Sequence, residues 1–156
     1  MRELRRNDKQ TTLDQAVELL SDAEYGTLST VDGDGQPYGV PLNYVYRDGA
    51  IYFHCALNGH KLDNIGGNPK VSFCVVGDVE VLPAEFSTSY QSVIAFGVAS
   101  EVVGNERYQA LEWLLEKYSS DFMEQGIKYI DKLDKVTRII KIEVRHVSGK
   151  KSPVKG

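Results

Sequence analysis

Residues 25–55 read YGTLSTVDGDGQPYGVPLNYVYRDGAIYFHC, and the fold follows from the strand pattern in this segment. It contains three runs with the alternating apolar and polar pattern of half-buried strands, at Tyr25–Val31, Pro37–Arg47 and Ala50–Cys55. Asp32–Gly35 and Asp48–Gly49 lie between the runs, and their glycines accept the positive φ angles of tight hairpins. Because such short turns join antiparallel neighbours, we predict a three-stranded antiparallel meander.

The remainder of the chain predicts three more strands and four helices. The predicted strands are Lys70–Val76, Ser92–Val103 and Thr137–Val147, and the predicted helices are Thr12–Ser21, His60–Ile65, Asn105–Tyr118 and Asp121–Leu133. Gly97, in the middle of a strand, predicts a bend of the kind that closes a barrel. The regular βαβ rhythm of a parallel sheet is absent. We therefore predict a mainly β (α+β) fold: a six-stranded antiparallel split β-barrel with Greek-key topology and peripheral helices.

Helix starts and loops carry their own signals. Thr12 and Asn105 are expected N-caps, and Asp121 followed by Glu124 has the spacing of a capping box. Residues 83–90 are predicted to form a polar loop. The inward face of the third helix is expected to consist of Tyr108, Leu111, Leu114, Leu115 and Tyr118.

Length and composition exclude several classes of protein. With 156 residues, 42% hydrophobic and 26% charged, the chain suits one globular domain over residues 1–156. The 18 Lys and Arg against 22 Asp and Glu give a net charge of −4, which disfavours nucleic-acid binding because phosphate backbones attract clustered cations. No apolar run is long enough to cross a membrane, and the N-terminus lacks a secretory signal. With only two cysteines, these features predict a cytoplasmic protein without a membrane partner.

The segment His54–Ile65 carries the clearest chemical signal. A strand ends, Gly59 allows close backbone approach, and a short helix begins at His60 and Lys61. A helix N-terminus presents free N–H groups and a partial positive charge, which bind phosphate, and Lys61 adds a full charge. From the residues alone, a phosphate site competes with a plainer interpretation, namely a surface helix whose lysine is solvated.

A metal site and a reactive nucleophile are both disfavoured. His54 and Cys55 are neighbours in a strand, so their side chains point to opposite faces, and no CxxC or HxxxH spacing is present. Cys55 and Cys74 lie in apolar strands, where a buried thiol is usually inert. No Gly-x-Ser-x-Gly motif selects a serine. We therefore predict no metal ligands.

Several runs, in order along the chain, resemble the FMN-binding split-barrel superfamily, which includes the pyridoxamine 5′-phosphate oxidases. They are Tyr25–Thr30, Tyr38–Tyr46, Ile51–Ile65, Tyr90–Gly97 and His146–Lys150. Within that superfamily the sequence is most similar to the nitroimidazole-resistance (Nim-type) reductases. The resemblance implies a homodimer that binds two FMN molecules at the subunit interface.

The resemblance also implies which residues hold the cofactor. The expected contacts are Pro41, Leu42, Asn43 and Tyr44 at the isoalloxazine ring, His54 and Ala56 beside the ribityl chain or ring, and His60 and Lys61 at the phosphate, with Asn64 nearby. The partner subunit would supply Tyr90, Gln91 and Ser92. Flat tyrosine side chains would then wall a tricyclic ring and exclude water from it.

The chain departs from the pyridoxamine-type oxidases in two ways. No Arg or Lys lies between Pro37 and Tyr46, where those oxidases carry one of each on the flavin-edging strand. The chain also ends soon after Lys150, without their substrate-binding C-terminal segment. Both departures point away from vitamin B6 oxidation. The His60–Lys61 pair also carries less fixed charge than an Arg–Lys pair, which predicts a pH-dependent FMN affinity.

The leading functional hypothesis is an FMN-dependent oxidoreductase. Electrons would pass from a reduced nicotinamide or another donor, through FMN, to a small electron-poor aromatic acceptor such as a nitroaromatic, with His54 or Tyr90 as proton donor. Three alternatives stay open: a flavin-binding carrier or sensor without turnover, a haem-binding split barrel, and a barrel without cofactor. In the haem alternative the axial ligand would be His54, His60 or His146.

Overall fold

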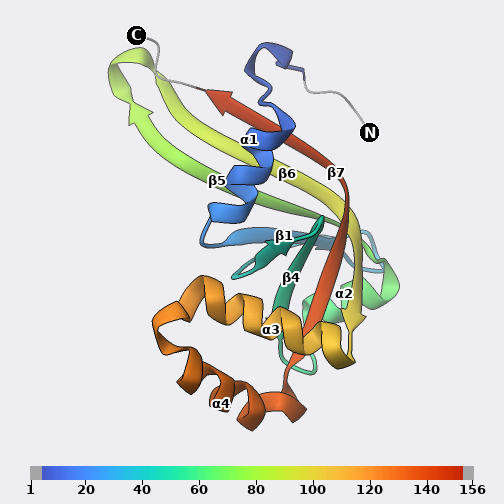
Figure 1. The fold of residues 1–156 in the computed structure, drawn as a ribbon. Coiled ribbons are helices and arrows are strands. Elements are labelled where there is room, and N and C mark those ends of the chain that lie inside the picture. The colour runs from blue at the N-terminus through green and yellow to red at the C-terminus, as the bar shows by residue number, and fades with distance from the viewer. Residues whose placement is uncertain (1–4, 153–156) are drawn as a thin grey trace.

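The computed structural model describes residues 5–152, which form one antiparallel sheet with helices around it (Figure 1). The strands are β1 (Gly26–Val31), β2 (Pro37–Leu42), β3 (Val45–Arg47), β4 (Ala50–Cys55), β5 (Lys70–Leu82), β6 (Ser87–Val102) and β7 (Arg138–Ser152). The α-helices are α1 (Leu13–Asp22), α2 (His60–Gly67), α3 (Gly104–Ser119) and α4 (Met123–Leu133), and 3₁₀ turns lie at Asn7–Lys9, Pro83–Glu85, Ser120–Phe122 and Asp134–Val136. The predicted mainly β, antiparallel class is confirmed.

A bent strand joins the two edges of the sheet. The strand order is β2-β1-β5-β6-β7-β4-β3, and every neighbouring pair is antiparallel. The single strand predicted over residues 37–47 breaks at Asn43 and Tyr44 into β2, which pairs with β1, and β3, which pairs with β4. The predicted meander is therefore two hairpins, and the sheet has seven strands rather than six because this one strand is split.

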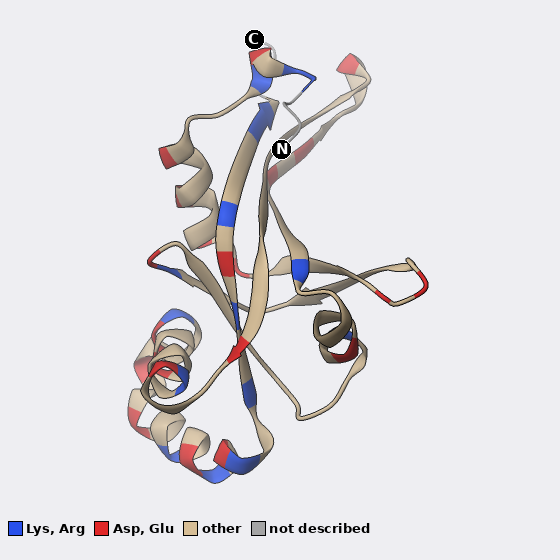
Figure 2. Ribbon diagram, turned by 90° about the vertical axis from the view of Figure 1, so that its right-hand side faces the viewer, with Lys and Arg blue, Asp and Glu red and all other residues tan. Residues whose placement is uncertain are grey.

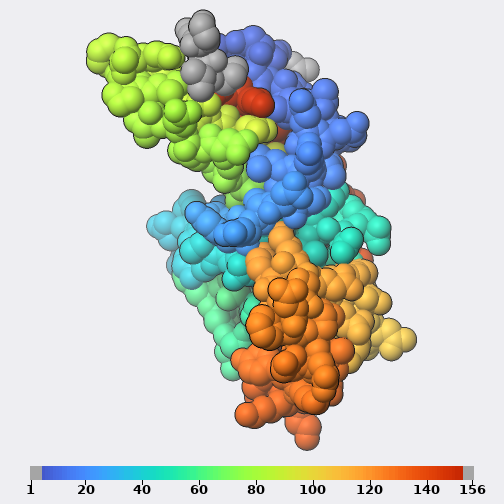
Figure 3. Space-filling model, turned by 60° about the vertical axis from the view of Figure 1, so that its left-hand side comes forward, coloured from blue at the N-terminus to red at the C-terminus, as the bar shows by residue number. Residues whose placement is uncertain are grey.

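β5 and β6 extend well beyond the barrel as an arm, residues 77–92 (Figure 1). The arm is two-stranded over residues 77–89, because β7 pairs with β6 only from Tyr90 onward. The strand predicted over residues 70–76 continues to Leu82, and the loop predicted over residues 83–90 is wrong for residues 87–90, which already belong to β6. The arm's valines are exposed, so it lacks the buried face that makes a strand visible in a sequence. In Figure 3 the arm lies at one end of the molecule, and α3 and α4 form a lobe at the other.

Gly97 bends β6, as predicted. The pairing of β6 with β7 shifts register between Phe96 and Gly97. A Cβ at Gly97 would lie 2.4 Å from the carbonyl oxygen of Glu143 on β7. The close approach of the two backbones therefore requires glycine at this position.

Two apolar clusters share β4 between them. Ile51, Phe53 and Cys55 face the barrel interior, which α1 covers with Ala16 and Leu20. The alternate β4 residues belong to a second cluster against α3 and α4, made of Val45, Ala50, Tyr52, Val102, Ala110, Leu111, Leu114, Ile130 and Ile139. β4 is therefore buried on both faces from Ala50 to Phe53 and again at Cys55, while His54 between them is exposed.

Of the predicted helix caps, only the one at the start of α1 is confirmed. Thr12 and Gln15 form the reciprocal capping box there. The cap predicted at Asn105 is wrong, since α3 begins at Gly104 without a side-chain cap. The box predicted at residues 121–124 is also wrong, because a 3₁₀ turn occupies Ser120–Phe122 and α4 begins at Met123 without a side-chain cap. Tertiary contacts, rather than local capping, therefore fix the starts of α3 and α4.

Candidate functional site

The end of β4 and the start of α2 form the centre of the candidate site. β4 ends at Cys55, and α2 begins at His60 directly after Gly59, whose φ of 155° is rarely adopted by residues with a side chain. A Cβ at Gly59 would meet no atom within 4 Å, so the space beside this backbone is open. The first N–H groups of a helix have no intrahelical partner, so this turn offers donors to an anion.

His54, His60 and Lys61 lie at the same edge of the barrel. Burial lowers the pKa of the His54 imidazole, and the nearby Lys61 ammonium lowers it further. The His60 ring packs against Tyr38 of β2, with ring centroids 4.1 Å apart. Tyr38 was not among the predicted site residues, because only the tertiary structure brings the start of β2 to α2. The structure thus places His54 near Lys61 and Tyr38 against His60 at the start of α2, directly after the open Gly59 backbone.

Asn64 anchors α2 to the barrel rather than facing solvent. Its side chain is buried and donates a hydrogen bond from Nδ2 to the hydroxyl of Thr30 on β1, at 2.9 Å. Asn64 was predicted to lie near the phosphate site, but its side-chain amide is already used in the core. Ala56, by contrast, is exposed in the loop after β4.

The corner between β2 and β3 presents its first residues to solvent. Pro41 and Asn43 are exposed and Leu42 is half-buried. The Asn43 amide donates to the carbonyl of Glu24 at 3.0 Å, which fixes the corner on the segment before β1. These three residues are therefore accessible to a ligand at the edge of the sheet.

Tyr44 corrects one sequence prediction. Its ring is fully buried against Phe73, with centroids 4.6 Å apart, and its hydroxyl donates to the carbonyl of Leu20. Burial raises the pKa of this phenol, so it stays protonated. The Tyr44 side chain is thus part of the core and does not edge a ring, because the strand break at this corner turns it inward.

Two residues at the end of α3 hold this corner, and no sequence pattern predicted this role for either of them. The Tyr118 hydroxyl accepts from the Tyr44 N–H at 3.0 Å and lies 2.6 Å from the carbonyl oxygen of Glu24. Lys117 donates to the carbonyl of Ala23 at 2.8 Å, and its Nζ lies 4.2 Å from the centroid of the Tyr44 ring. Burial lowers the pKa of Lys117 to about 8. Tyr118, predicted to be buried, is 37% exposed because it reaches sideways to the corner.

Tyr90, Gln91 and Ser92 lie on the arm, far along β6 from the other predicted site residues. His54 pairs with Ile139 of β7, which pairs with Val102 of β6, and Tyr90 is twelve residues before Val102. That separation is up to about 40 Å of extended strand. Within one chain, the structure does not bring His54 and Tyr90 together.

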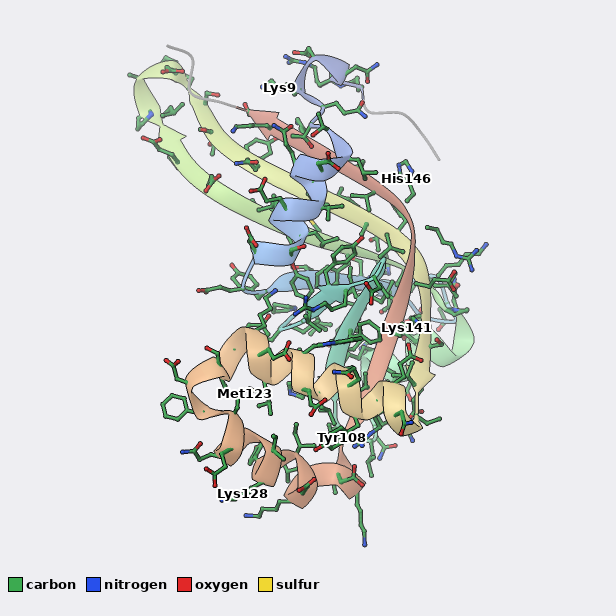
Figure 4. The ribbon with its side chains drawn as sticks, viewed as in Figure 1. Lys9, Tyr108, Met123, Lys128, Lys141 and His146 are labelled. Carbon is green, nitrogen blue, oxygen red and sulfur yellow. The ribbon has the colours of Figure 1, made fainter. Side chains whose placement is uncertain are left out.

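The cysteines and the third histidine lie outside this constellation. Burial raises the pKa of both the Cys55 and the Cys74 thiol, which disfavours the reactive thiolate form. His146 is exposed on β7, seven residues from the partner of His54, and Figure 4 shows it on the part of β7 beside α1. Among residues 5–152, no group of three or more His, Cys, Asp or Glu side chains is placed to hold a metal ion.

Comparison with protein families gives one match over most of the chain. The family model described as pyridoxamine 5′-phosphate oxidase matches residues 12–151. No curated protein matches the sequence. None of the helices in the described part of the chain combines the length and the apolar character needed to cross a bilayer.

Solved structures share the fold at low sequence identity. A conserved hypothetical protein from Mycobacterium tuberculosis superimposes with a TM-score of 0.79 at 21% identity, covering 95% of this chain and 90% of its own. The FAD and haem binding protein from Mycobacterium smegmatis gives 0.78 at 19% identity, covering 95% and 77%. A proposed 5-nitroimidazole antibiotic resistance protein from Bacteroides thetaiotaomicron gives 0.73 at 19% identity, covering 89% and 83%. At these identities the likeness establishes the split-barrel fold.

Proposed function

The chain belongs to the pyridoxamine 5′-phosphate oxidase family, and on this basis we propose that it is an FMN-dependent oxidoreductase. The observation that carries the proposal is the open backbone at Gly59, followed directly by a helix N-terminus and Lys61. Two fold neighbours support it, since one binds FAD and haem and another is a proposed nitroimidazole resistance protein. The residues at the candidate site must then fit a flavin.

The phosphate of FMN fits the start of α2. The helix N-terminus offers N–H donors, Lys61 supplies a full positive charge, and the absent side chain at Gly59 leaves room for an anion. His60, held against Tyr38, adds an imidazole donor at the same place. Lys61 and His60 would hold the phosphate, and Asn64 would keep the helix in position through Thr30.

The ring of FMN fits the free edge of β2. This strand is at one end of the sheet order, so half of its backbone N–H and C=O groups lack a strand partner among the described residues. Gly39, where an added Cβ would meet only Thr27 at 3.6 Å, allows a flat ring to approach that edge. Pro41, Leu42 and Asn43 continue the same edge, and we assign them to the ring's polar rim.

When bound, FMN supplies electron transfer from a reduced nicotinamide or another donor to a small, electron-poor aromatic acceptor. The chain's own part is to orient the two molecules and to exclude water. His54 is uncharged at neutral pH, because its pKa is lowered, and can still donate an N–H hydrogen bond. We assign it to the ring or to the acceptor as a hydrogen-bond donor. Transfer of a proton from His54 would require its protonated imidazolium form, and Tyr90 of a second subunit is the alternative proton donor.

We also propose a homodimer, because the arm supplies both an apolar face and the remaining site residues. Val79, Val81 and Phe86 are 62%, 67% and 98% exposed, and large exposed apolar residues gathered in one place mark interfaces. Tyr90, Gln91 and Ser92 on the same arm would then reach the flavin of the partner. The two cysteines are free, as expected in a reducing cytoplasm, which is the location that we propose.

The test compares FMN with riboflavin, which lacks the phosphate. Replacing Lys61 with alanine should weaken FMN binding about 10- to 100-fold, the worth of one charge-assisted hydrogen bond, and leave riboflavin binding nearly unchanged. Lys128→Ala is the matched control, since Lys128 is an exposed lysine on α4 paired with Glu124. Titration of flavin fluorescence measures the six affinities, those of the wild type and both variants for FMN and for riboflavin. An unchanged FMN affinity in Lys61→Ala would remove the phosphate assignment.

Turnover is tested on the FMN-loaded protein. We expect NADH or NADPH to bleach the flavin absorption without oxygen and a nitroimidazole to restore it. Bleaching without restoration would leave a flavin-binding protein without this activity. A purified protein that carries a Soret band and ignores FMN would replace the proposal with haem binding.

A further inference from the structure

A cavity of about 310 Å³ lies between α3, α4 and the end of β4. It is lined by Asn43, His54, Arg107, Leu111, Leu114, Leu115, Tyr118, Ser119, Tyr129, Ile130, Leu133 and Thr137. Neither His60 nor Lys61 belongs to the lining, so the cavity is distinct from the anion site at α2. Its volume is within the range of small-molecule sites and is about twice that of cavities that hold benzene.

The two helices are well packed, so the cavity is not a loosened interface. A Cβ at Gly126 of α4 would lie 2.6 Å from Leu115 of α3, which shows how closely the helices approach there. Leu111, Leu114 and Ile130 are buried and form the apolar wall. Figure 4 shows Tyr108 of α3 on the side that faces α4. An apolar hollow of this size beside a closely packed helix pair indicates room for a ligand.

Polar groups lie at the two ends of the cavity. Asn43 and Tyr118 both contact the carbonyl of Glu24, which places them together at the end of α3. Arg107 lies near the start of α3 and donates a hydrogen bond to the carbonyl oxygen of Thr137, at 2.9 Å. Arg107 and Tyr118 are eleven residues apart on one helix, or about 16 Å. The lining therefore extends along about three turns of α3.

The lining carries no unpaired charge among the described residues. Arg107 is its one permanently charged side chain, and its guanidinium pairs with the Asp134 carboxylate at 2.5 Å and also bonds the Asp134 carbonyl at 2.8 Å. His54 stays uncharged at neutral pH because burial and Lys61 lower its pKa. An ionic ligand would therefore lose its hydration without gaining a counter-charge.

We propose that the cavity under α3 and α4 binds a small, neutral, aromatic molecule whose polar group meets His54 and Asn43. His54 belongs both to this cavity and to the flavin site described above. If the proposed function holds, the molecule bound here is the electron acceptor. The binding site itself does not depend on that function.

The test uses N-phenyl-1-naphthylamine, a neutral aromatic probe that becomes fluorescent in apolar surroundings. Leu133, at the end of α4, is only half-buried, so Leu133→Trp can fill the cavity without replacing a core residue. We expect this variant to bind the probe at least about tenfold more weakly. Val136→Trp is the matched control, because Val136 is 51% exposed, three residues away and outside the lining, and it should bind like the wild type.

A second filling variant and a charged probe complete the test. Ser119→Trp fills the other end, so a folding defect in one variant leaves the other to decide, with circular dichroism as the check. The anionic analogue 1-anilinonaphthalene-8-sulfonate should bind at least about tenfold more weakly than the neutral probe. Wild-type affinity in folded Leu133→Trp and Ser119→Trp, or equal affinity for the two probes, would overturn the proposal.

Probe binding and FMN binding, measured on the same protein, distinguish this proposal from the proposed function. Lys61→Ala should keep its affinity for the neutral probe while it loses affinity for FMN. Failure of the wild type to bind FMN, with probe binding intact and sensitive to Leu133→Trp, would remove the flavin function alone. Val79→Ser tests the exposed arm as a competing probe site, and loss of probe binding in this variant would count against the cavity.

Discussion

His54 shows how one residue can serve both the flavin site and the cavity under α3 and α4. It lies near the end of β4, where Ile51 and Phe53 fix the strand from the barrel side and Tyr52 fixes it from the α3 side. His54 directly precedes Cys55 in the chain, and its imidazole lies close to the Lys61 ammonium. Burial and this positive charge both favour the uncharged form, so its pKa lies below the ordinary value of 6.5.

This pKa predicts how stability depends on pH. The unfolded chain binds the His54 proton more readily than the folded chain, so this histidine makes folding less favourable as the pH falls below about 6.5. His54→Gln should show a shallower loss of unfolding free energy than the wild type between about pH 7.5 and pH 5.5. Urea denaturation at several pH values measures the free energy of unfolding of both proteins.

His146→Gln is the control for this prediction, since His146 is also a histidine on a strand but lies exposed on β7. It should retain the wild-type dependence on pH. Equal slopes for the wild type and His54→Gln would show that the imidazole titrates alike in the folded and unfolded chains.

At the scale of elements, β6 and β7 determine the shape of the barrel. Their pairing runs almost the full length of both strands and is interrupted at Gly97, where the strands bend from the arm into the barrel. The contact of Gly97 with the backbone of Glu143 leaves no room for a side chain. The position of α3, which follows β6, depends on this bend.

Gly97→Ala should therefore destabilise the fold by about 1–3 kcal/mol, the usual cost of overpacking. Gly39→Ala is the matched control, since it also lies in a strand but its Cβ would be 3.6 Å from Thr27, an ordinary contact. We expect Gly39→Ala to change stability by less than about 0.5 kcal/mol. Thermal unfolding of both variants measures the difference, and similar melting temperatures would mean that β7 shifts freely to accommodate the new methyl group.

At the scale of the whole molecule, the arm combines exposed apolar residues with the acidic Asp78, Glu80 and Glu85. Figure 2 shows acidic and basic residues interspersed on α3 and α4, whereas the arm carries Val79, Val81 and Phe86 in exposed positions. An arm that projects from the barrel with bare valines has little to stabilise it within one chain. A second copy of the chain would cover these exposed residues and would also complete the proposed flavin site.

Changing both Val79 and Val81 to serine should convert a dimer into monomers. We expect the wild type to sediment with twice the 17.4 kDa mass of one chain. The double variant should sediment with the mass of a single chain and should bind FMN more weakly. Val136→Ser is the control, because it removes a similarly exposed valine at the other end of the molecule. Sedimentation velocity measures the mass. A monomeric wild type with full FMN affinity would contradict the shared site.

Elements whose signals are local could be predicted from the amino-acid sequence alone. The glycine turns, the Thr12 cap, the start of α2 after Gly59 and the alternation in β1 and β4 depend on neighbouring residues, and these elements are predicted close to their observed bounds. β7 begins near its predicted start but continues five residues beyond the predicted end at Val147. The candidate anion site at His60 and Lys61 was visible for the same reason. Its donors are consecutive in the chain.

Features that depend on distant residues became visible only in the folded chain. Partners far along the chain determine the strand break at Asn43 and Tyr44 and the length of the arm. The same is true of the inward position of the Tyr44 ring and of the hydrogen bond between Tyr44 and Tyr118. The cavity under α3 and α4 belongs to the same group, because its walls come from two helices and a strand end. Local patterns record which face of an element is apolar, but packing decides which element it meets and where space is left.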